Sequence, residues 1–226
     1  MQVNPSTVAH SMKSPLFISL DGPKGTGKTT LAEAVTQALR ADGHKVVRLS
    51  EKMNDPHRAE TMGLVNALAR NPSVALELSI CERLAQSRAW ISQQVLPKQP
   101  AGSIILIDRW YPSDAAFRRL IPFAEALRLN MEQHVRVPDL HVGVITDPQI
   151  SWDRAAARTR GLGSTVIQAF HEHVAATQAF EQAFIDHGWL LCRNEGTIEL
   201  ATRQVAAAIG EVTRGADQAV GKRGYL

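Results

Sequence analysis

The chain alternates short apolar runs with longer stretches in which apolar residues recur at helical spacing. The apolar runs predict five strands, at 16–20, 45–49, 103–107, 140–145 and 189–192. The helical spacing predicts helices at 31–39, 56–70, 74–96, 115–132 with a break at 121–122, 148–158, 166–186 and 197–212. Strands separated by helices form parallel sheets that helices cover on both faces. We therefore expect an α/β fold of three layers around a five-stranded parallel sheet.

The length of 226 residues fits a single α/β domain, which we expect at 15–212. Residues 1–14 contain several polar side chains and no apolar core, so we expect a flexible leader there. The segment 213–226 is glycine-rich and basic, and we expect it to form a loose tail. No internal repeat or low-complexity stretch divides the sequence.

Composition narrows the possible partners. The hydrophobic content of 44% and charged content of 21% are those of a soluble globular protein, and the net charge of +3 is too small to indicate nucleic-acid binding. The apolar run at 104–107 is too short to span a bilayer, and 1–14 lacks the apolar region of a signal peptide. Cys81 and Cys192 form no metal-binding pattern and suit a reducing compartment. We expect a cytoplasmic protein without a nucleic-acid or membrane partner.

The segment between the first strand and the first helix, residues 22–29, reads GPKGTGKT. It fits the phosphate-binding pattern G-x-x-x-x-G-K-[ST] in the strand–loop–helix context that this motif requires. The glycines let backbone amides turn toward a phosphate at the positive end of the next helix. Lys28 can reach the β- and γ-phosphates, and the Thr29 hydroxyl can ligate Mg²⁺. The alternative is a plain glycine-rich turn before a core helix.

This P-loop predicts a P-loop NTPase-type fold that binds ATP and Mg²⁺. The residues expected to contact the nucleotide from this loop are Gly22, Lys24, Gly25, Thr26, Gly27, Lys28, Thr29 and Thr30.

A second candidate site, Asp108-Arg109-Trp110, follows the strand expected at 103–107. Ligands of open α/β sheets bind beyond the carboxyl ends of the strands, so these residues should face the P-loop. Asp108 can hold Mg²⁺ or orient an acceptor, and Arg109 can bind a phosphate with two parallel hydrogen bonds. The alternative is an ion pair at the end of a strand.

A third candidate site is the arginine-rich segment 154–163, with Arg154 and Arg158 on one helix face and Arg160 beside two glycines. An arginine-bearing loop near a P-loop can act as a lid that excludes water and stabilises the transferring phosphoryl group. We expect a short lid at about 154–166, in which Arg158 and Arg160 act. The alternative is a solvated basic helix end.

A fourth candidate site is the long helix expected at 74–96, which carries Glu82, Arg83 and Arg88. These arginines could reach the cleft or pair with carboxylates at the surface, and the residues alone favour the surface.

These motifs together resemble the thymidylate kinase family of P-loop nucleoside monophosphate kinases. The resemblance covers residues 15–212 and rests on three features, the segment from Phe17 into the P-loop, Asp108-Arg109-Trp110, and the arginine-rich lid. It implies that Arg88 reaches the base of the acceptor and that Phe117 helps to form the base pocket. It also implies that Arg193 lies near the adenine of ATP, and that the protein is a homodimer.

The sequence departs from the family pattern on the acceptor side. After the second strand only Glu51 remains of the family's Arg-Glu-Pro-Gly, Lys24 stands where many members have an acidic residue, and Arg118 replaces a glutamine. The two cations would suit an additional phosphate or a different acceptor. The donor side keeps the family pattern.

The sequence thus predicts an ATP-dependent phosphotransferase, most similar to a nucleoside monophosphate kinase. Two alternatives remain, a kinase of deoxynucleosides or of a specialised metabolite, and a nucleotide-binding regulatory protein without activity. The residues expected in catalysis are Lys28, Asp108, Arg109, Arg158 and Arg160, with Thr29 and Asp108 as metal ligands. The residues expected to bind the acceptor are Glu51, Arg88, Arg109, Trp110, Phe117 and Arg118.

Overall fold

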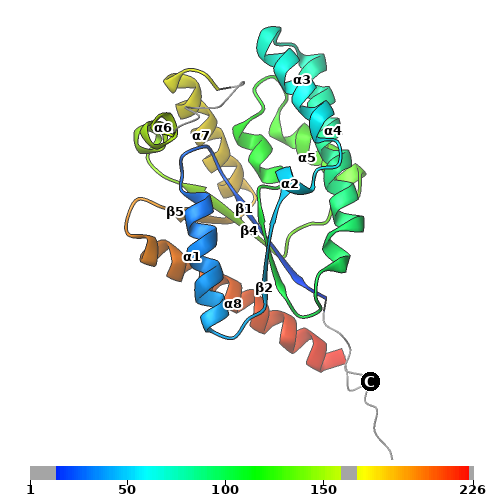
Figure 1. Ribbon diagram of the computed structural model, residues 1–226, viewed down its shortest axis with the longest axis vertical. Helices are drawn as coiled ribbons and strands as arrows, with labels where there is room; N and C mark the ends of the chain where they lie inside the picture. Colours follow the sequence, from blue (N-terminus) through cyan, green and yellow to red (C-terminus); the bar gives the residue numbers. More distant parts are fainter. Residues whose placement is uncertain (1–13, 159–166, 224–226) are drawn as a thin grey trace, which may run out of the picture.

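The computed structural model describes residues 14–158 and 167–223, with the backbone alone for 216–223. Its centre is a five-stranded sheet in which every neighbouring pair is parallel (Figure 1). The strands are β1 (Leu16–Asp21), β2 (Val46–Ser50), β3 (Ile104–Asp108), β4 (Leu140–Ile145) and β5 (Leu190–Arg193), in the spatial order β2-β3-β1-β4-β5. The predicted five-stranded parallel sheet is confirmed.

Helices cover both faces of the sheet. The elements are α1 (Lys28–Ala41), α2 (Glu51–Asn54), α3 (Arg58–Arg70), α4 (Val74–Gln94), η1 (Leu96–Lys98), η2 (Tyr111–Ala116), α5 (Phe123–Glu132), α6 (Pro148–Ala156), α7 (Phe170–Asp186) and α8 (Ile198–Arg223). Figure 1 shows α1 and α8 lying together on one face, whereas α4 and α7 pack against the other.

Strand β1 shows why the apolar runs predicted a covered sheet. Ile18 and Leu20 point into the core beneath α1 and α8, whereas Phe17 points into the core beneath α4. All three side chains are buried. A strand buried on both faces has apolar residues at successive positions, which is the pattern of a central parallel strand.

Some elements of the structure differ from the prediction. The helix expected at 115–132 is a 3₁₀ helix, η2, followed by a separate helix, α5, that begins after Pro122. The short helix α2 after β2 was not predicted. The loose tail expected from 213 is wrong for 213–223, because α8 continues to Arg223. Glycines weaken a helix by roughly 1 kcal/mol each without necessarily ending it.

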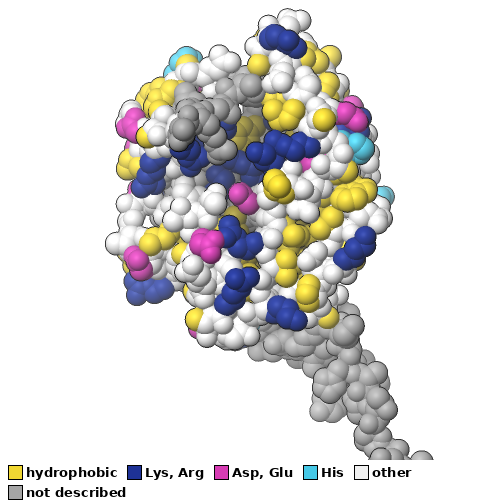
Figure 2. Space-filling view, in the orientation of Figure 1, with side chains coloured by type: hydrophobic (Ala, Val, Ile, Leu, Met, Phe, Trp, Pro, Cys, Tyr) yellow, Lys and Arg dark blue, Asp and Glu magenta, His cyan; other side chains and the backbone are white. Residues whose placement is uncertain are grey.

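The carboxyl ends of the strands meet at one edge of the sheet. Asp21 is the last residue of β1, and Gly22 comes directly after it. Glu51 follows β2, Arg109 follows β3 and Asn194 follows β5. Figure 2 shows, in the same orientation, a hollow below α3 and between α3 and α6, with Lys and Arg side chains around it. This is the edge at which open α/β sheets bind ligands.

Candidate active site

The P-loop is packed so tightly that two of its positions require glycine. Gly25 has φ +80°, and a Cβ built on it would lie 1.8 Å from the carbonyl oxygen of Ser151 in α6. Gly27 has φ +86°, and its Cβ would lie 2.3 Å from the amide nitrogen of Asn194. The Asn194 amide donates to the Thr26 carbonyl at 2.9 Å. The loop is therefore fixed by α6 on one side and by the segment after β5 on the other.

Lys28 begins α1 and is only 7% exposed. Its ammonium group donates to the Pro23 carbonyl and to the Thr26 hydroxyl, so it lies folded against its own loop. Burial lowers the pKa of Lys28 well below its usual value, and Arg109 lowers it further, while Asp108 acts in the opposite direction. A polyphosphate is the kind of anion that would stabilise this buried cation.

Arg109 reaches from the end of β3 to the P-loop. Its φ of +74° is rare for a residue with a side chain, and such strain clusters at functional sites. Its Nη1 donates to the Gly22 carbonyl at 2.9 Å, and its guanidinium lies 4.8 Å from the centre of the Phe117 ring. The predicted meeting of this arginine with the phosphate loop is confirmed by that hydrogen bond.

Asp21 is a site residue that the sequence analysis missed. Its Oδ1 accepts hydrogen bonds from the Trp110 and Ser113 amides and from the Ser113 hydroxyl, at 2.6–3.1 Å. Its Oδ2 is buried and has no hydrogen-bond partner among the described residues. Burial raises the pKa of this carboxyl, although Ser113 and Trp110 oppose the shift. Its position as the last residue of a strand, directly before the first glycine of the loop, was the available signal.

The side chain of Trp110 belongs to the hydrophobic core. Its side chain is fully buried, packs edge-to-face on Phe17 with ring centroids 5.3 Å apart, and donates its indole N–H to the Arg136 carbonyl at 3.0 Å. The prediction that Trp110 binds the acceptor is therefore wrong for its side chain, because the direction of a side chain after a strand is set by core packing.

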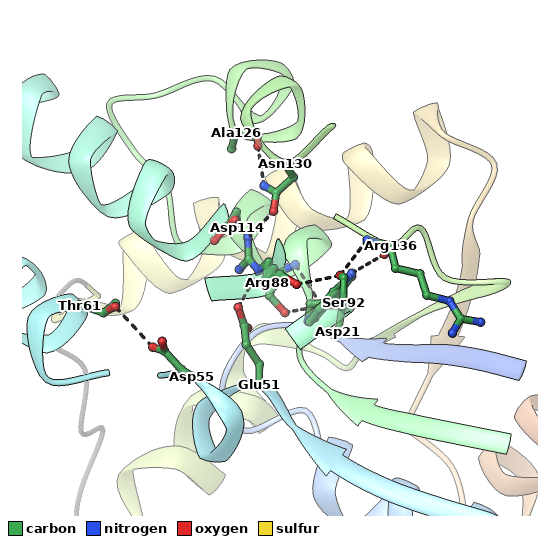
Figure 3. Close-up of polar contacts among 12 residues, drawn as sticks. Asp21, Glu51, Asp55, Thr61, Arg88, Ser92, Asp114, Ala126, Asn130 and Arg136 are labelled. Atoms are coloured by element: carbon green, nitrogen blue, oxygen red, sulfur yellow. Dashed lines mark hydrogen bonds and ion pairs between the residues drawn. The ribbon is translucent and has the colours of Figure 1, made fainter. Parts of the chain in front are cut away.

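Arg88 lies in a buried cluster of charges, shown in Figure 3. Its Nε donates to Glu51 at 2.6 Å, and its Nη1 donates to Asp114 at 2.6 Å and to Asn130 at 3.1 Å. Burial opposes the charge of Arg88, but Asp114 and Glu51 raise its pKa above the usual value. Its guanidinium is therefore held by protein groups.

Glu82 and Arg83, the other two charged residues that the sequence analysis named in α4, lie at the surface. Glu82 is exposed, and Arg83 pairs with Glu60 of α3 at 3.0 Å. The surface interpretation is thus confirmed for these two residues and wrong for Arg88. The sequence analysis missed Asp114 and Asn130, because their positions along the chain did not indicate that they contact Arg88.

Arg118 lies at the other side of Asp114. Its side chain is 6% exposed, and its Nε is 3.8 Å from Asp114 Oδ1. Its Nε and Nη1 are buried and form no hydrogen bond with any described residue. Arg118 is thus a buried cation with a long ion pair to Asp114.

Other expected nucleotide contacts are at least partly exposed. Thr29 and Thr30 are exposed in the first turn of α1, and Lys24 is half-buried in the loop. Arg193 is 59% exposed and pairs with Glu181.

The lid is only partly described. Its first residues, 154–156, belong to α6. Arg158 is exposed, and its charge lowers the pKa of Lys28 and of Arg109, so it lies within electrostatic reach of the loop. Arg160 and the rest of the expected lid, 159–166, lie outside the described residues.

In the described part of the chain, no three His, Cys, Asp or Glu side chains are grouped so that they could hold a metal ion by themselves. None of the helices at 14–158 and 167–223 is long and apolar enough to span a bilayer.

Comparison with known proteins gives one consistent result. A family model described as thymidylate kinase matches residues 20–204. The chain is 30% identical over 185 residues to a thymidylate kinase of Deinococcus radiodurans, covering 77% of this chain and 84% of the relative. It is 27% identical over 176 residues to a thymidylate kinase of Gluconobacter oxydans, covering 71% and 78%. A relative of the same description from Ruegeria pomeroyi is 30% identical over 152 residues, covering 63% and 69%.

Proposed function

The chain belongs to the thymidylate kinase family, and from this premise we propose that it transfers the γ-phosphoryl group of ATP to a nucleoside monophosphate. Membership makes it an ATP-dependent kinase, a transferase, and favours this function over a nucleoside kinase or a non-catalytic protein. The observation that carries the proposal is the hydrogen bond from Arg109 to Gly22, because it joins the acceptor-side arginine to the phosphate loop.

The donor phosphates bind at the P-loop. The loop amides and the positive end of α1 surround the phosphates, and Lys28 turns from its loop carbonyl onto the β- and γ-phosphates. In this proposal Arg193 and the neighbouring backbone contact the adenine. In this state Lys28 exchanges neutral oxygen partners for anionic ones, which form stronger hydrogen bonds.

The acceptor phosphate binds Arg109, whose guanidinium group stacks over the Phe117 ring. One oxygen of this phosphate attacks the γ-phosphorus in line, while the bond from the γ-phosphorus to the bridging oxygen of the β-phosphate breaks. The products are ADP and a nucleoside diphosphate. Because the transition state is loose, the protein contributes positioning and positive charge, from Lys28, Arg109, Arg158 and Arg160, rather than covalent chemistry.

The oxygen atoms at this edge fit Mg²⁺. This ion is usually held by one or two carboxylates together with substrate phosphates, so a cage of three protein carboxylates is not required. Asp108 and the Thr29 hydroxyl would hold it, and the buried, unpartnered Oδ2 of Asp21 is a further oxygen suited to it. When bound, the ion neutralises charge on the β- and γ-phosphates. A homodimer and a cytoplasmic location complete the proposal.

The proposal is tested by measuring ADP release from ATP and Mg²⁺ with each common deoxynucleoside monophosphate and with the corresponding free nucleosides. We expect at least one monophosphate to support turnover and the nucleosides to support none. Turnover with nucleosides alone would contradict the proposal in favour of a nucleoside kinase. ATP binding without turnover for any acceptor would contradict it in favour of a regulatory protein.

A further inference from the structure

Two buried arginines on the acceptor side differ in their hydrogen bonding. Arg88, whose side chain is 2% exposed, donates to Glu51, Asp114 and Asn130. These three hydrogen bonds use the N–H group of Nε and both N–H groups of Nη1. They hold the Arg88 side chain between α2, η2 and α5.

Arg118 is in the opposite situation. The 3.8 Å between its Nε and Asp114 Oδ1 is longer than a hydrogen bond, and neither its Nε nor its Nη1 has a hydrogen-bond partner in the described ranges. A buried donor without a partner is strongly unfavourable, and more so when it is charged. Turning this side chain toward a ligand breaks no hydrogen bond of these two atoms.

The position of Arg118 fits the far end of an acceptor. Its neighbour Phe117 lies under Arg109, which we assign to the acceptor phosphate. Glu51 interacts electrostatically with Arg109, pairs with Arg88, and Arg88 pairs with Asp114. The charges therefore alternate from Arg109 to Arg118, and the last member of the row is the one with two buried donor atoms that lack a hydrogen-bond partner among the described residues.

The charges and hydrogen-bond donors around Arg118 indicate which ligand atom it can bind. The two carboxylates of Glu51 and Asp114 balance the two guanidinium groups of Arg88 and Arg118, so no further anion is required. A guanidinium offers only donors, so it stabilises an oxygen and leaves an amino group without a partner. We propose that Arg118 is an acceptor-specificity residue, which donates hydrogen bonds to a ring carbonyl oxygen at the end of the acceptor remote from its phosphate. The proposal rests on the proposed function.

The test measures binding rather than turnover, by calorimetry with a non-hydrolysable ATP analogue present. In each of two matched pairs of probes, one member carries a ring carbonyl oxygen where the other carries an amino group, and the adjacent ring nitrogen changes from a donor to an acceptor. They are thymidine and 5-methyldeoxycytidine monophosphates, and deoxyguanosine and 2,6-diaminopurine deoxyribonucleoside monophosphates. We expect the wild-type protein to favour the oxygen-bearing member of one pair by at least about tenfold, since a site built for a hydrogen bond rejects the analogue that cannot form it.

Arg118→Gln and Arg118→Met should abolish this preference by weakening the binding of the oxygen-bearing probe. Arg128→Gln removes an arginine from an exposed ion pair of α5 and should leave the preference intact. Thermal unfolding of each variant checks the fold, and two Arg118 variants are used so that one unstable protein does not end the test.

The inference is overturned if the wild-type protein shows no preference within either pair, or if the preference survives in a folded Arg118 variant. A protein that shows the Arg118-dependent preference but never forms ADP contradicts the proposed function and supports this inference. A protein that forms ADP without an Arg118-dependent preference contradicts this inference alone.

Discussion

Lys28 is a buried cation that donates hydrogen bonds to uncharged oxygens of its own loop. We assign Lys28 to stabilise the negative charge of the transferring phosphoryl group. We expect Lys28→Met to lower kcat/KM by about 100-fold or more, the usual effect of removing one preorganised charge contact. The measurement is ADP formation with the best acceptor. Lys98→Met, at an exposed lysine of η1, should leave the rate unchanged. An active Lys28→Met protein would refute the assignment.

His141 gives the fold a pH dependence. Burial, with a smaller effect of His187, lowers the pKa of His141 to about 4, and its ring hydrogen-bonds to Ser19 and Tyr111. The unfolded chain has a pKa near 6.5, so it binds the proton more readily than the folded protein does. The stabilising contribution is therefore complete above pH 6.5 and is lost as pH falls toward 4.

We expect the free energy of unfolding to fall by about 2 kcal/mol between pH 7.5 and 5 because of this histidine. Urea unfolding of the wild-type and His141→Gln proteins at both pH values measures it. The variant should be less stable at pH 7.5 but should lose less stability on acidification. Equal losses in the two proteins would rule out His141 as the cause.

At the scale of elements, the P-loop is held against α6 by a contact that leaves no room for a side chain. Gly25 and Gly43 have nearly the same backbone, with φ +80° and +86°, but a Cβ on Gly43 would meet nothing within 4 Å. An alanine substitution at Gly43 therefore measures the loss of stability caused by the backbone conformation alone. The same substitution at Gly25 adds the collision with Ser151.

We expect Gly43→Ala to lose about 1–2 kcal/mol of stability and to keep its affinity for ATP. Gly25→Ala should lose more stability and also its ATP affinity, because the loop must move away from α6. Urea unfolding and calorimetry with ATP measure the two effects. Unchanged ATP affinity in Gly25→Ala would show that this packing does not shape the phosphate site.

The helix α4 is tied to α2, η2 and α5 by the charges around Arg88. Arg88→Met would leave two buried carboxylates without their partner. We expect it to lower the free energy of unfolding by about 3–5 kcal/mol, the cost of breaking a buried ion pair. Arg83→Met, which removes the surface pair with Glu60, should cost at most about 1 kcal/mol. Similar losses in both variants would contradict the structural role of Arg88.

These elements also show which parts of the site the sequence could predict. The P-loop and Arg109 were predictable, because their chemistry lies in short motifs at the ends of apolar strands. The partners of Arg88 were not, since Asp114 and Asn130 are 26 and 42 residues away along the chain. Trp110 shows a related limit, because a motif gives the position of a residue and core packing gives its direction.

At the scale of the whole molecule, the strand order explains why one edge carries all of this chemistry. With β1 at the centre and β3 beside it, the P-loop and Arg109 become neighbours although they are about ninety residues apart. The alternation of apolar runs predicted this sheet, because strands buried on both faces keep a strong hydrophobic signal. The end of α8 was mispredicted, because glycines there weaken the helical pattern without ending the helix.

The central claim is that the P-loop and Arg109 bind the donor and acceptor phosphates side by side. The phosphoryl group can then pass directly from ATP to the acceptor. The most direct measurement is a single-turnover reaction with ATP labelled at the γ-phosphorus, followed by separation of protein, nucleotides and inorganic phosphate. We expect the label to leave ATP and to accumulate in the nucleoside diphosphate formed from the acceptor. Label that remains in ATP for every acceptor, or that collects on the protein or in inorganic phosphate, would contradict the account.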